Sequence, residues 1–314
     1  MPEFLTVSAS PHVRAEASSR SLMLTVLIAL LPALVWAIYI YGFRPLIVTL
    51  LSVITCVASE FLYQKLMKKR ITVSDLSAAV TGVILAFNLP PTIPYYLVIF
   101  GGIFAIVVVK QLFGGIGKNF LNPALAARVF LFIAWSKPMA TFAAPEWLPL
   151  FGSGDVVASA TPLASLKNGD MSRIDLDIVQ AFIGDKAGCI GEISCMLLLV
   201  GGLLMLFRRV ITWHIPVSFV ATVWIYSLVS GGAPAHVQIL TGGVLLGAIF
   251  MATDYVTTPA TSKGKVVFGV GCGALCMLIR QFGSYPEGCS FAILIMNAFT
   301  PLISRWTQPK PFGG

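Results

Sequence analysis

The residues best suited to chemistry lie in a polar interval, 151–170, between two sets of apolar segments. Its centre reads DVVASATP, so the Thr161 hydroxyl stands among small residues and directly before Pro162, in a loop open to an enzyme or ligand. Threonine is a common helix N-cap and proline suits the first helical position, which predicts one or two helical turns over 163–167. The free amides of such a turn attract anions, and they would favour a phosphate on Thr161. The alternative is a threonine that only caps a helix.

Composition decides which kind of scaffold must hold this loop. The chain has 57% hydrophobic and 11% charged residues with a mean hydropathy of +0.88, whereas soluble domains have about 25% charged residues. Long apolar runs predict membrane-spanning helices rather than barrel strands. The lead 1–20 is too polar for a signal peptide. We expect an all-α integral membrane protein with helices at 21–42, 45–63, 75–90, 94–112, 122–136, 191–207, 211–230, 237–253, 264–282 and 288–305.

The positions of lysine and arginine predict the orientation. With a cytoplasmic N-terminus, 15 of the 21 basic residues fall on the cytoplasmic side, as the positive-inside rule requires. The chain is then a multi-pass protein of the cell membrane with both termini in the cytoplasm, and the Thr161 loop lies outside the cytoplasm. The run KLMKKR at 65–70 becomes a cytoplasmic anchor rather than a nucleic-acid site.

An internal repeat is visible when the segments are aligned. Thr81-Gly82 with its following apolar residues recurs at Thr241, and KQLFG at Lys110 recurs as RQFG at Arg280. Since each half has five helices, the second half enters from the opposite face, which gives two inverted repeats. The expected organisation is a lead at 1–20, repeats at 21–136 and 191–305, an extracytoplasmic loop at 137–190 and a cytoplasmic tail at 306–314.

The spans offer little ion-carrying chemistry. We expect the ionisable residues to lie toward helix ends, which leaves only polar neutral side chains for a relay. The ionisable residues are Glu60, Lys110, Arg128, Glu192, His214, Asp254 and Arg280, and the neutral ones include Thr81, Asn88, Thr241 and Asn297. Cys272 and Cys276 share a helix face, but two thiols in a glycine-rich helix are typical of packing rather than of a metal site. Phosphate-loop, dinucleotide and zinc-protease motifs are absent from the sequence.

Four stretches resemble one known family over essentially the whole chain. They are SPHVRAEASSRSLM near the start, GGIGKNFLNPALAARV at 114–129, DVVASATPL at 155–163 and HVQILTGGVLLGAIFMATDYVTTP at 236–259. The resemblance is to the RnfD/NqrB family, which comprises a membrane component of the Rnf electron-transport complex and its counterpart in the sodium-pumping quinone reductase. The short lead is closer to the Rnf component.

The resemblance implies a covalent cofactor on the polar loop. In this family a flavin transferase recognises D-x-x-x-[ST/G]-A-T and joins the phosphate of FMN to the threonine hydroxyl. Asp155, Ser159, Ala160 and Thr161 match the pattern. Related subunits also carry a noncovalent flavin such as riboflavin. No motif assigns its residues, although broken helices and polar side chains gather around Asn88, Asn122 and Asp254.

The implied function is an electron relay in an ion-translocating ferredoxin:NAD oxidoreductase that is inactive without its partners. The partners would be membrane iron–sulfur subunits, a second flavinylated subunit, and cytoplasmic subunits that react with ferredoxin and NAD. One departure concerns the family motif A-T-D-P-V, where this chain has Tyr255 in place of proline. A solute channel of the urea-channel type and a structural membrane scaffold are the alternatives, and neither needs a flavin loop.

Overall fold

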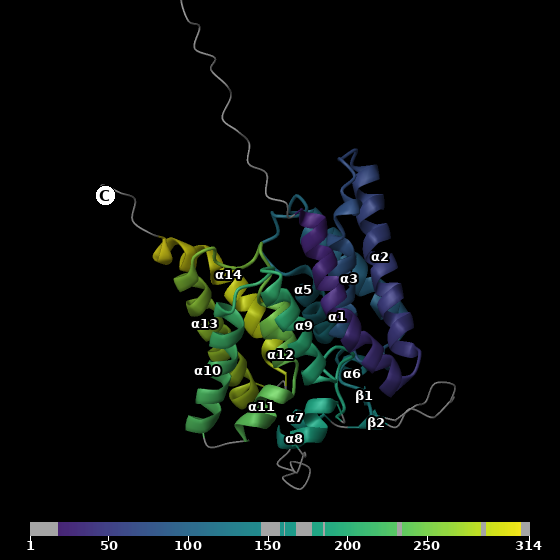
Figure 1. The fold of residues 1–314 in the computed structure, drawn as a ribbon. Coiled ribbons are helices and arrows are strands. Elements are labelled where there is room, and N and C mark those ends of the chain that lie inside the picture. The colour runs from purple at the N-terminus through teal and green to yellow at the C-terminus, as the bar shows by residue number, and fades with distance from the viewer. Residues whose placement is uncertain are drawn as a thin grey trace, which may run out of the picture.

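The computed structural model describes residues 18–145, 158–159, 161–167, 178–184, 186–230, 234–283 and 287–308. Helices make up most of this part of the chain (Figure 1). The first half contains α1 (Ser19–Tyr41), α2 (Arg44–Leu66), the 3-10 helix η1 (Val73–Asp75), α3 (Ser77–Phe87), α4 (Tyr95–Ile103), the π-helix η2 (Phe104–Gln111) and α5 (Pro123–Ala134).

Between α5 and the second half of the chain, the described residues form short elements. They are α6 (Ser136–Met139), β1 (Phe142–Ala143), β2 (Ala158–Ser159), α7 (Pro162–Lys167) and α8 (Ile178–Ile183). β1 and β2 pair in antiparallel fashion, with Phe142 opposite Ser159. The predicted loop therefore carries local structure that its sequence did not predict, apart from α7.

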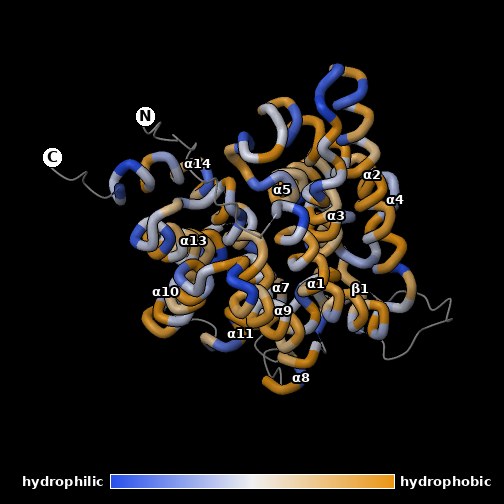
Figure 2. Tube along the Cα trace, turned by 45° about the horizontal axis from the view of Figure 1, so that its top comes forward, coloured by the Kyte–Doolittle hydropathy of each residue, from blue (hydrophilic) through white to orange (hydrophobic). Residues whose placement is uncertain are grey.

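The second half also contains long helices and interrupted ones. It contains α9 (Cys195–Phe207), α10 (His214–Ser230), α11 (Ala235–Leu240), α12 (Val244–Leu246), the π-helix η4 (Gly247–Met251), α13 (Ser262–Phe282) and α14 (Cys289–Thr307). Hydrophobic residues cover most of the long helices, and hydrophilic residues concentrate near their ends (Figure 2).

Among the described residues, four helices are long and apolar enough to cross a membrane: α1, α2, α13 and α14. Shorter apolar helices accompany them, because several expected spans are interrupted. The predicted helix 237–253 is wrong as a continuous helix, since it divides into α11, α12 and η4. Thr241 is extended, and Gly242 and Gly243 have φ of 66° and 68°, a left-handed conformation that glycine adopts without a steric penalty.

Packing joins the two halves around one apolar core. α2 packs on α3 and α4, while α10 packs on α13 in the second half. α1 lies against α9, and α5 lies against α14, so both pairs cross between the halves. Side chains such as Phe87, Leu125 and Phe219 are completely buried in this core. The end of α3, the middle of α5 and the start of α14 meet inside it, and there the chain places polar groups.

Candidate functional site

Thr161 caps α7 as the sequence predicts. Its hydroxyl accepts a hydrogen bond from the Ala164 amide at 3.2 Å, and Pro162 is the first residue of the helix. The sequence predicted that this hydroxyl is open to an enzyme. In the structure Thr161 is only 5% exposed, so the hydroxyl is covered. Asp155 and Ala160 lie outside the described residues, and Ser159 is placed only by its backbone in β2.

The break between α11 and α12 supports α7. Gly242 leaves no room for a β-carbon, which would come within 2.3 Å of Leu163 Cδ1 and 2.4 Å of a terminal nitrogen of Arg280. At the other end of α7, Lys167 donates to the Gly283 carbonyl at the end of α13. The short helix α7 is therefore held by groups from the second half of the chain.

Arg280 provides a fixed positive charge beside this contact. One terminal nitrogen donates to the Gln238 carbonyl and side-chain oxygens at 2.6 and 2.8 Å. The other donates to the carbonyls of Thr241 and Gly242 at 3.0 and 3.2 Å. The side chain is buried and its Nε has no hydrogen-bond partner within the described residues. The sequence repeat pairs this residue with Lys110, but it does not predict the carbonyls that Arg280 binds.

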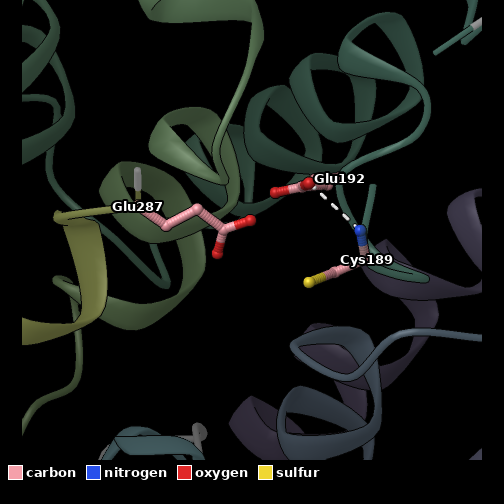
Figure 3. A group of neighbouring side chains, drawn as sticks. All are labelled: Cys189, Glu192 and Glu287. Carbon is pink, nitrogen blue, oxygen red and sulfur yellow. Dashed lines mark hydrogen bonds between the residues drawn. The ribbon is translucent and has the colours of Figure 1, made fainter. Parts of the chain in front are cut away.

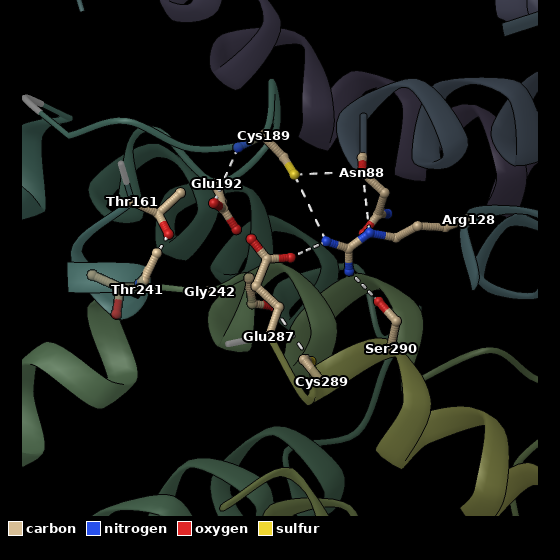
Figure 4. Close-up of polar contacts among 12 residues, drawn as sticks. Asn88, Arg128, Thr161, Cys189, Glu192, Thr241, Gly242, Glu287, Cys289 and Ser290 are labelled. Atoms are coloured by element: carbon tan, nitrogen blue, oxygen red, sulfur yellow. Dashed lines mark hydrogen bonds and ion pairs between the residues drawn. The ribbon is translucent and has the colours of Figure 1, made fainter. Parts of the chain in front are cut away.

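A second group of charges lies deeper, where broken helix ends meet (Figure 4). Arg128 donates from Nε to the Asn88 carbonyl at 3.1 Å, and from its terminal nitrogens to Ser290 and to the Glu287 carboxylate. Cys189 Sγ lies 3.7 Å from the guanidinium. Arg128 sits in the middle of α5, so the expectation that it lies toward a helix end is wrong.

Three of the nearby side chains have metal-ligand chemistry (Figure 3). The thiol of Cys189 and the carboxylates of Glu192 and Glu287 each offer one ligand atom, and these atoms lie within 4.8 Å of one another. One Glu192 oxygen already accepts from the Cys189 amide at 3.0 Å, and Glu287 is paired with Arg128. Because the guanidinium already supplies the positive charge, the arrangement is better described as a buried ion-pair network than as a metal site.

A further ion pair lies at the far end of α2. Lys110 donates to Glu60 Oε2 at 2.8 Å and to Ser77 Oγ at 2.6 Å. Gln111 and Gln64 donate to the other Glu60 oxygen at 2.9 and 3.2 Å. Both charged side chains are almost fully buried. The sequence did not predict this pair, because Glu60 and Lys110 come from helices that are far apart in the sequence.

Lys110 also borders a cavity between the two halves. The cavity has a volume of about 100 Å³. The structure brings two of the three residues named from the sequence, Asn122 and Asp254, to this cavity, while Asn88 donates to the neighbouring Met251 sulfur at 3.1 Å. Other polar lining groups come from Ser77, Thr81, Asn119 and Thr253.

The carboxylate in this cavity is held in an unusual environment. Burial raises the pKa of Asp254, although the Val256 amide and the Thr257 hydroxyl both donate to the carboxylate and oppose that shift. Tyr255 occupies the position where the resembled motif has proline. Its hydroxyl donates a hydrogen bond to the Val210 carbonyl. Tyr255 thus ties this turn to the connection between α9 and α10.

Cys272 and Cys276 are fully buried in α13. The same helix brings Gly269 and Gly273 against α10, where an added β-carbon would meet Ser218 and Thr222. Their setting agrees with the expected role of small residues in close helix packing.

Comparisons with known proteins cover nearly the whole chain. Residues 6–313 match the family model described as "NQR2, RnfD, RnfE family". The D component of the Na(+)-translocating ferredoxin:NAD(+) oxidoreductase complex of Acetobacterium woodii is 49% identical over 311 residues, covering 98% of this chain and 95% of that protein.

Two further relatives have similar coverage. The D component of the proton-translocating ferredoxin:NAD(+) oxidoreductase complex of Clostridium ljungdahlii is 41% identical, covering 98% of this chain and 96% of that protein. The D component of the ion-translocating oxidoreductase complex of Halorhodospira halophila is 36% identical, covering 97% and 94%.

Proposed function

The chain belongs to the NQR2, RnfD, RnfE family, and we propose on that basis that it is the RnfD electron relay of an ion-translocating ferredoxin:NAD oxidoreductase complex. The observation that carries this proposal is the 49% identity to such a component over almost its full length. The same match disfavours a solute channel, whose architecture alone could not decide function. Relatives are named for sodium and for proton translocation, so the family match leaves the identity of the ion open.

The redox group on this chain would be FMN, joined through its phosphate to the Thr161 hydroxyl. The supporting features are the match of Asp155, Ser159 and Ala160 to the transferase pattern and the α7 amides that begin after Thr161. Arg280 lies against the same break and its Nε has no hydrogen-bond partner among the described residues, so it supplies a cation suited to balance a phosphate. When bound, the flavin would supply the electron transfer, while the protein fixes its position and potential.

The covered hydroxyl implies an order of events for this attachment. The transferase must reach Thr161 while α7 is away from Gly242, or before α7 docks there. Once attached, the flavin would be positioned by the contacts of Leu163 and Lys167 with the second half of the chain. Flavin attachment and docking of α7 are therefore coupled in this proposal.

A second, noncovalent flavin of the riboflavin type is assigned here to the cavity beside Asp254. Amide and hydroxyl groups of Asn119, Asn122 and Thr81 offer the donors and acceptors that a flavin ring edge needs. The water-sized space of about 100 Å³ is below the ~300–1,000 Å³ of typical ligand pockets. The residues match in chemistry, and the walls must separate to admit the ring.

The proposed architecture has ten spans in two inverted five-helix repeats, with both termini cytoplasmic in the cell membrane. In support, each half contains five helical units in sequence. In the first half they are α1, α2, η1 with α3, α4 with η2, and α5. In the second half they are α9, α10, α11 with α12 and η4, α13, and α14. The units are the lead 1–20, the repeats 21–136 and 191–305, the external loop 137–190 and the tail 306–314. Partners would be iron–sulfur membrane subunits, a second flavinylated subunit, ferredoxin- and NAD-reacting subunits, the flavin transferase and lipid.

Covalent fluorescence tests the proposal directly. Protein made together with the flavin transferase and denatured in detergent should give a yellow fluorescent band, and Thr161→Ala should abolish it because the acceptor hydroxyl is removed. Thr141→Ala, which alters a threonine in the same proposed external loop 137–190, is the matched control and should keep the band. A fluorescent Thr161→Ala band would overturn the assignment.

A further inference from the structure

A lipid-facing groove separates α9 from α10. These helices follow one another in the chain but pack elsewhere, α9 on α1 and α10 on α13. The groove between them has a volume of about 530 Å³, and Leu245 and Ile249 lie beneath it. Its walls come from Leu199, Gly202, Leu203 and Leu206 of α9 and from Pro216, Val217, Val220, Ala221, Trp224 and Ile225 of α10.

The lining is apolar apart from the indole nitrogen of Trp224. Several of the wall residues, including Leu203 and Val217, are more than half exposed, and Ala221 is exposed between bulkier neighbours. An empty groove of this kind forfeits dispersion contacts along its walls. Its occupant in a membrane is therefore an apolar chain.

Positive charge gathers at one end of the groove. Leu206 and Ile211 line that end, and Arg208 and Arg209 lie between them in sequence. Both arginines are exposed, and their side chains make no hydrogen bond or ion pair with the part of the chain that the structure describes. Lys265 reaches the same connection, where its Nζ donates to Thr212 Oγ1 at 3.3 Å.

We propose that this groove binds one anionic phospholipid, with an acyl chain between α9 and α10 and the phosphate on Arg208, Arg209 and Lys265. Basic pockets between membrane helices are suited to anionic headgroups. A partner helix would have to bring acidic groups to these three cations, whereas one lipid supplies both the apolar chain and the negative charge. The exposed Trp213 in the same connection suits the headgroup level, where aromatic side chains anchor membrane proteins.

Native mass spectrometry of the detergent-purified protein tests the headgroup part of this proposal. Titration with dioleoyl phosphatidylglycerol or dioleoyl phosphatidylcholine should show one phosphatidylglycerol retained in preference. The double variant Arg208→Gln/Arg209→Gln should lose this preference, by on the order of thirtyfold for two charges near the headgroup. Arg305→Gln, a basic residue at the end of α14, is the control and should leave it unchanged.

The acyl-chain part is tested by filling the groove. Ala221→Trp should reduce retention of both lipids, whereas Ala58→Trp, at an exposed position of α2, should not. Equal retention of the two lipids by the unaltered protein, or unchanged binding in both the arginine and Ala221 variants, would overturn the proposal. It would equally fail if Leu203→Cys in the purified complex crosslinked to another protein component while no phospholipid remained bound.

Discussion

Arg128 connects more of the interior than any neighbouring side chain in Figure 4. It lies in α5, yet it binds the Asn88 carbonyl at the end of α3 and the Ser290 hydroxyl in α14, and it pairs with Glu287. Its hydrogen bonds satisfy carbonyl and carboxylate oxygens that are left without partners where helices break. A buried charge of this kind is tolerated because every side of it is paired.

Loss of this one side chain should therefore be costly. Arg128→Met leaves the Glu287 carboxylate buried without its partner, and we expect a loss of about 3–5 kcal/mol in the free energy of unfolding. The midpoint of thermal unfolding in detergent, followed by tryptophan fluorescence, measures the effect. Arg70→Met, which alters an exposed arginine, should leave the midpoint unchanged.

A second variant separates the ion pair from simple loss of packing. Arg128→Met combined with Glu287→Gln removes the unpaired charge and should recover a large part of the lost stability. If Arg128→Met unfolds at the temperature of the unaltered protein, the pair contributes nothing and the description of this network is wrong.

For single residues, the sequence predicted the contacts made with neighbours in the chain. Thr161 as a cap followed from its own hydroxyl and from Pro162, and the structure has that cap. The burial of the hydroxyl did not follow, because Gly242 and Arg280 approach α7 from far along the chain. The pairing of Arg128 with Glu287 was missed for the same reason.

Among the helices and their connections, the interruptions matter most. The break at Gly242 and Gly243 frees the carbonyls that Arg280 binds and makes the surface on which α7 rests. The sequence repeat that begins with Thr81 and Thr241 marked this region. Apolar residues continue through it, however, so hydrophobicity predicted one helix over 237–253. The continuous runs of α1 and α2 had no such feature and were predicted within a few residues.

The break also provides a test at the level of elements. Gly242→Ala adds a β-carbon that would collide with Leu163 and Arg280, so α7 should be displaced and the unfolding midpoint lowered. Gly117→Ala is the matched control, because its φ of 84° carries the same left-handed strain of about 1–2 kcal/mol with nothing within 4 Å of the added atom. The measurement is thermal unfolding of both variants, together with protease susceptibility of the 161–167 segment. Equal destabilisation of the two variants would show that α7 does not depend on Gly242.

For the whole molecule, composition was enough to predict a helical membrane protein, and the structure has four clear spans among its described residues. The number of spans and their direction depend on how the shorter, broken helices cross. Hydropathy alone does not give the number of spans, because α3 and α5 are short apolar helices whose ends lie inside the core. The orientation therefore remains a proposal based on lysine and arginine positions.

Reporter fusions test this orientation. Fusions after Lys69, Arg209 and Gly264 should report the cytoplasm, and fusions near Gly169 and Gly232 should report the outside, because basic connections are retained inside. A cytoplasmic result at Gly169 would contradict the ten-span layout, since one span gained or lost before Thr161 reverses the loop.

The last prediction concerns the chain alone and in its complex. Interior carboxylates are present, but Glu60 and Glu287 are paired with Lys110 and Arg128. Glu192 accepts from the Cys189 amide, and Asp254 accepts from the Val256 amide and the Thr257 hydroxyl. An electron on the flavin can move an ion only through a state with different interactions. In the proposed relay, such states form only when the partner proteins are bound. We expect no redox-driven ion uptake by the protein reconstituted alone, even with its flavin attached.

The assembled complex in liposomes, supplied with reduced ferredoxin and NAD, should take up ions, and its Thr161→Ala version should lose electron flow and ion uptake together. Thr141→Ala should keep both, because it leaves the attachment site intact. Joint loss in the Thr161 variant is expected because electrons that cannot pass the loop flavin cannot reach the steps that move ions. Uptake at full rate in that variant would place the loop flavin outside the electron path, and the protein would then not be an obligatory relay.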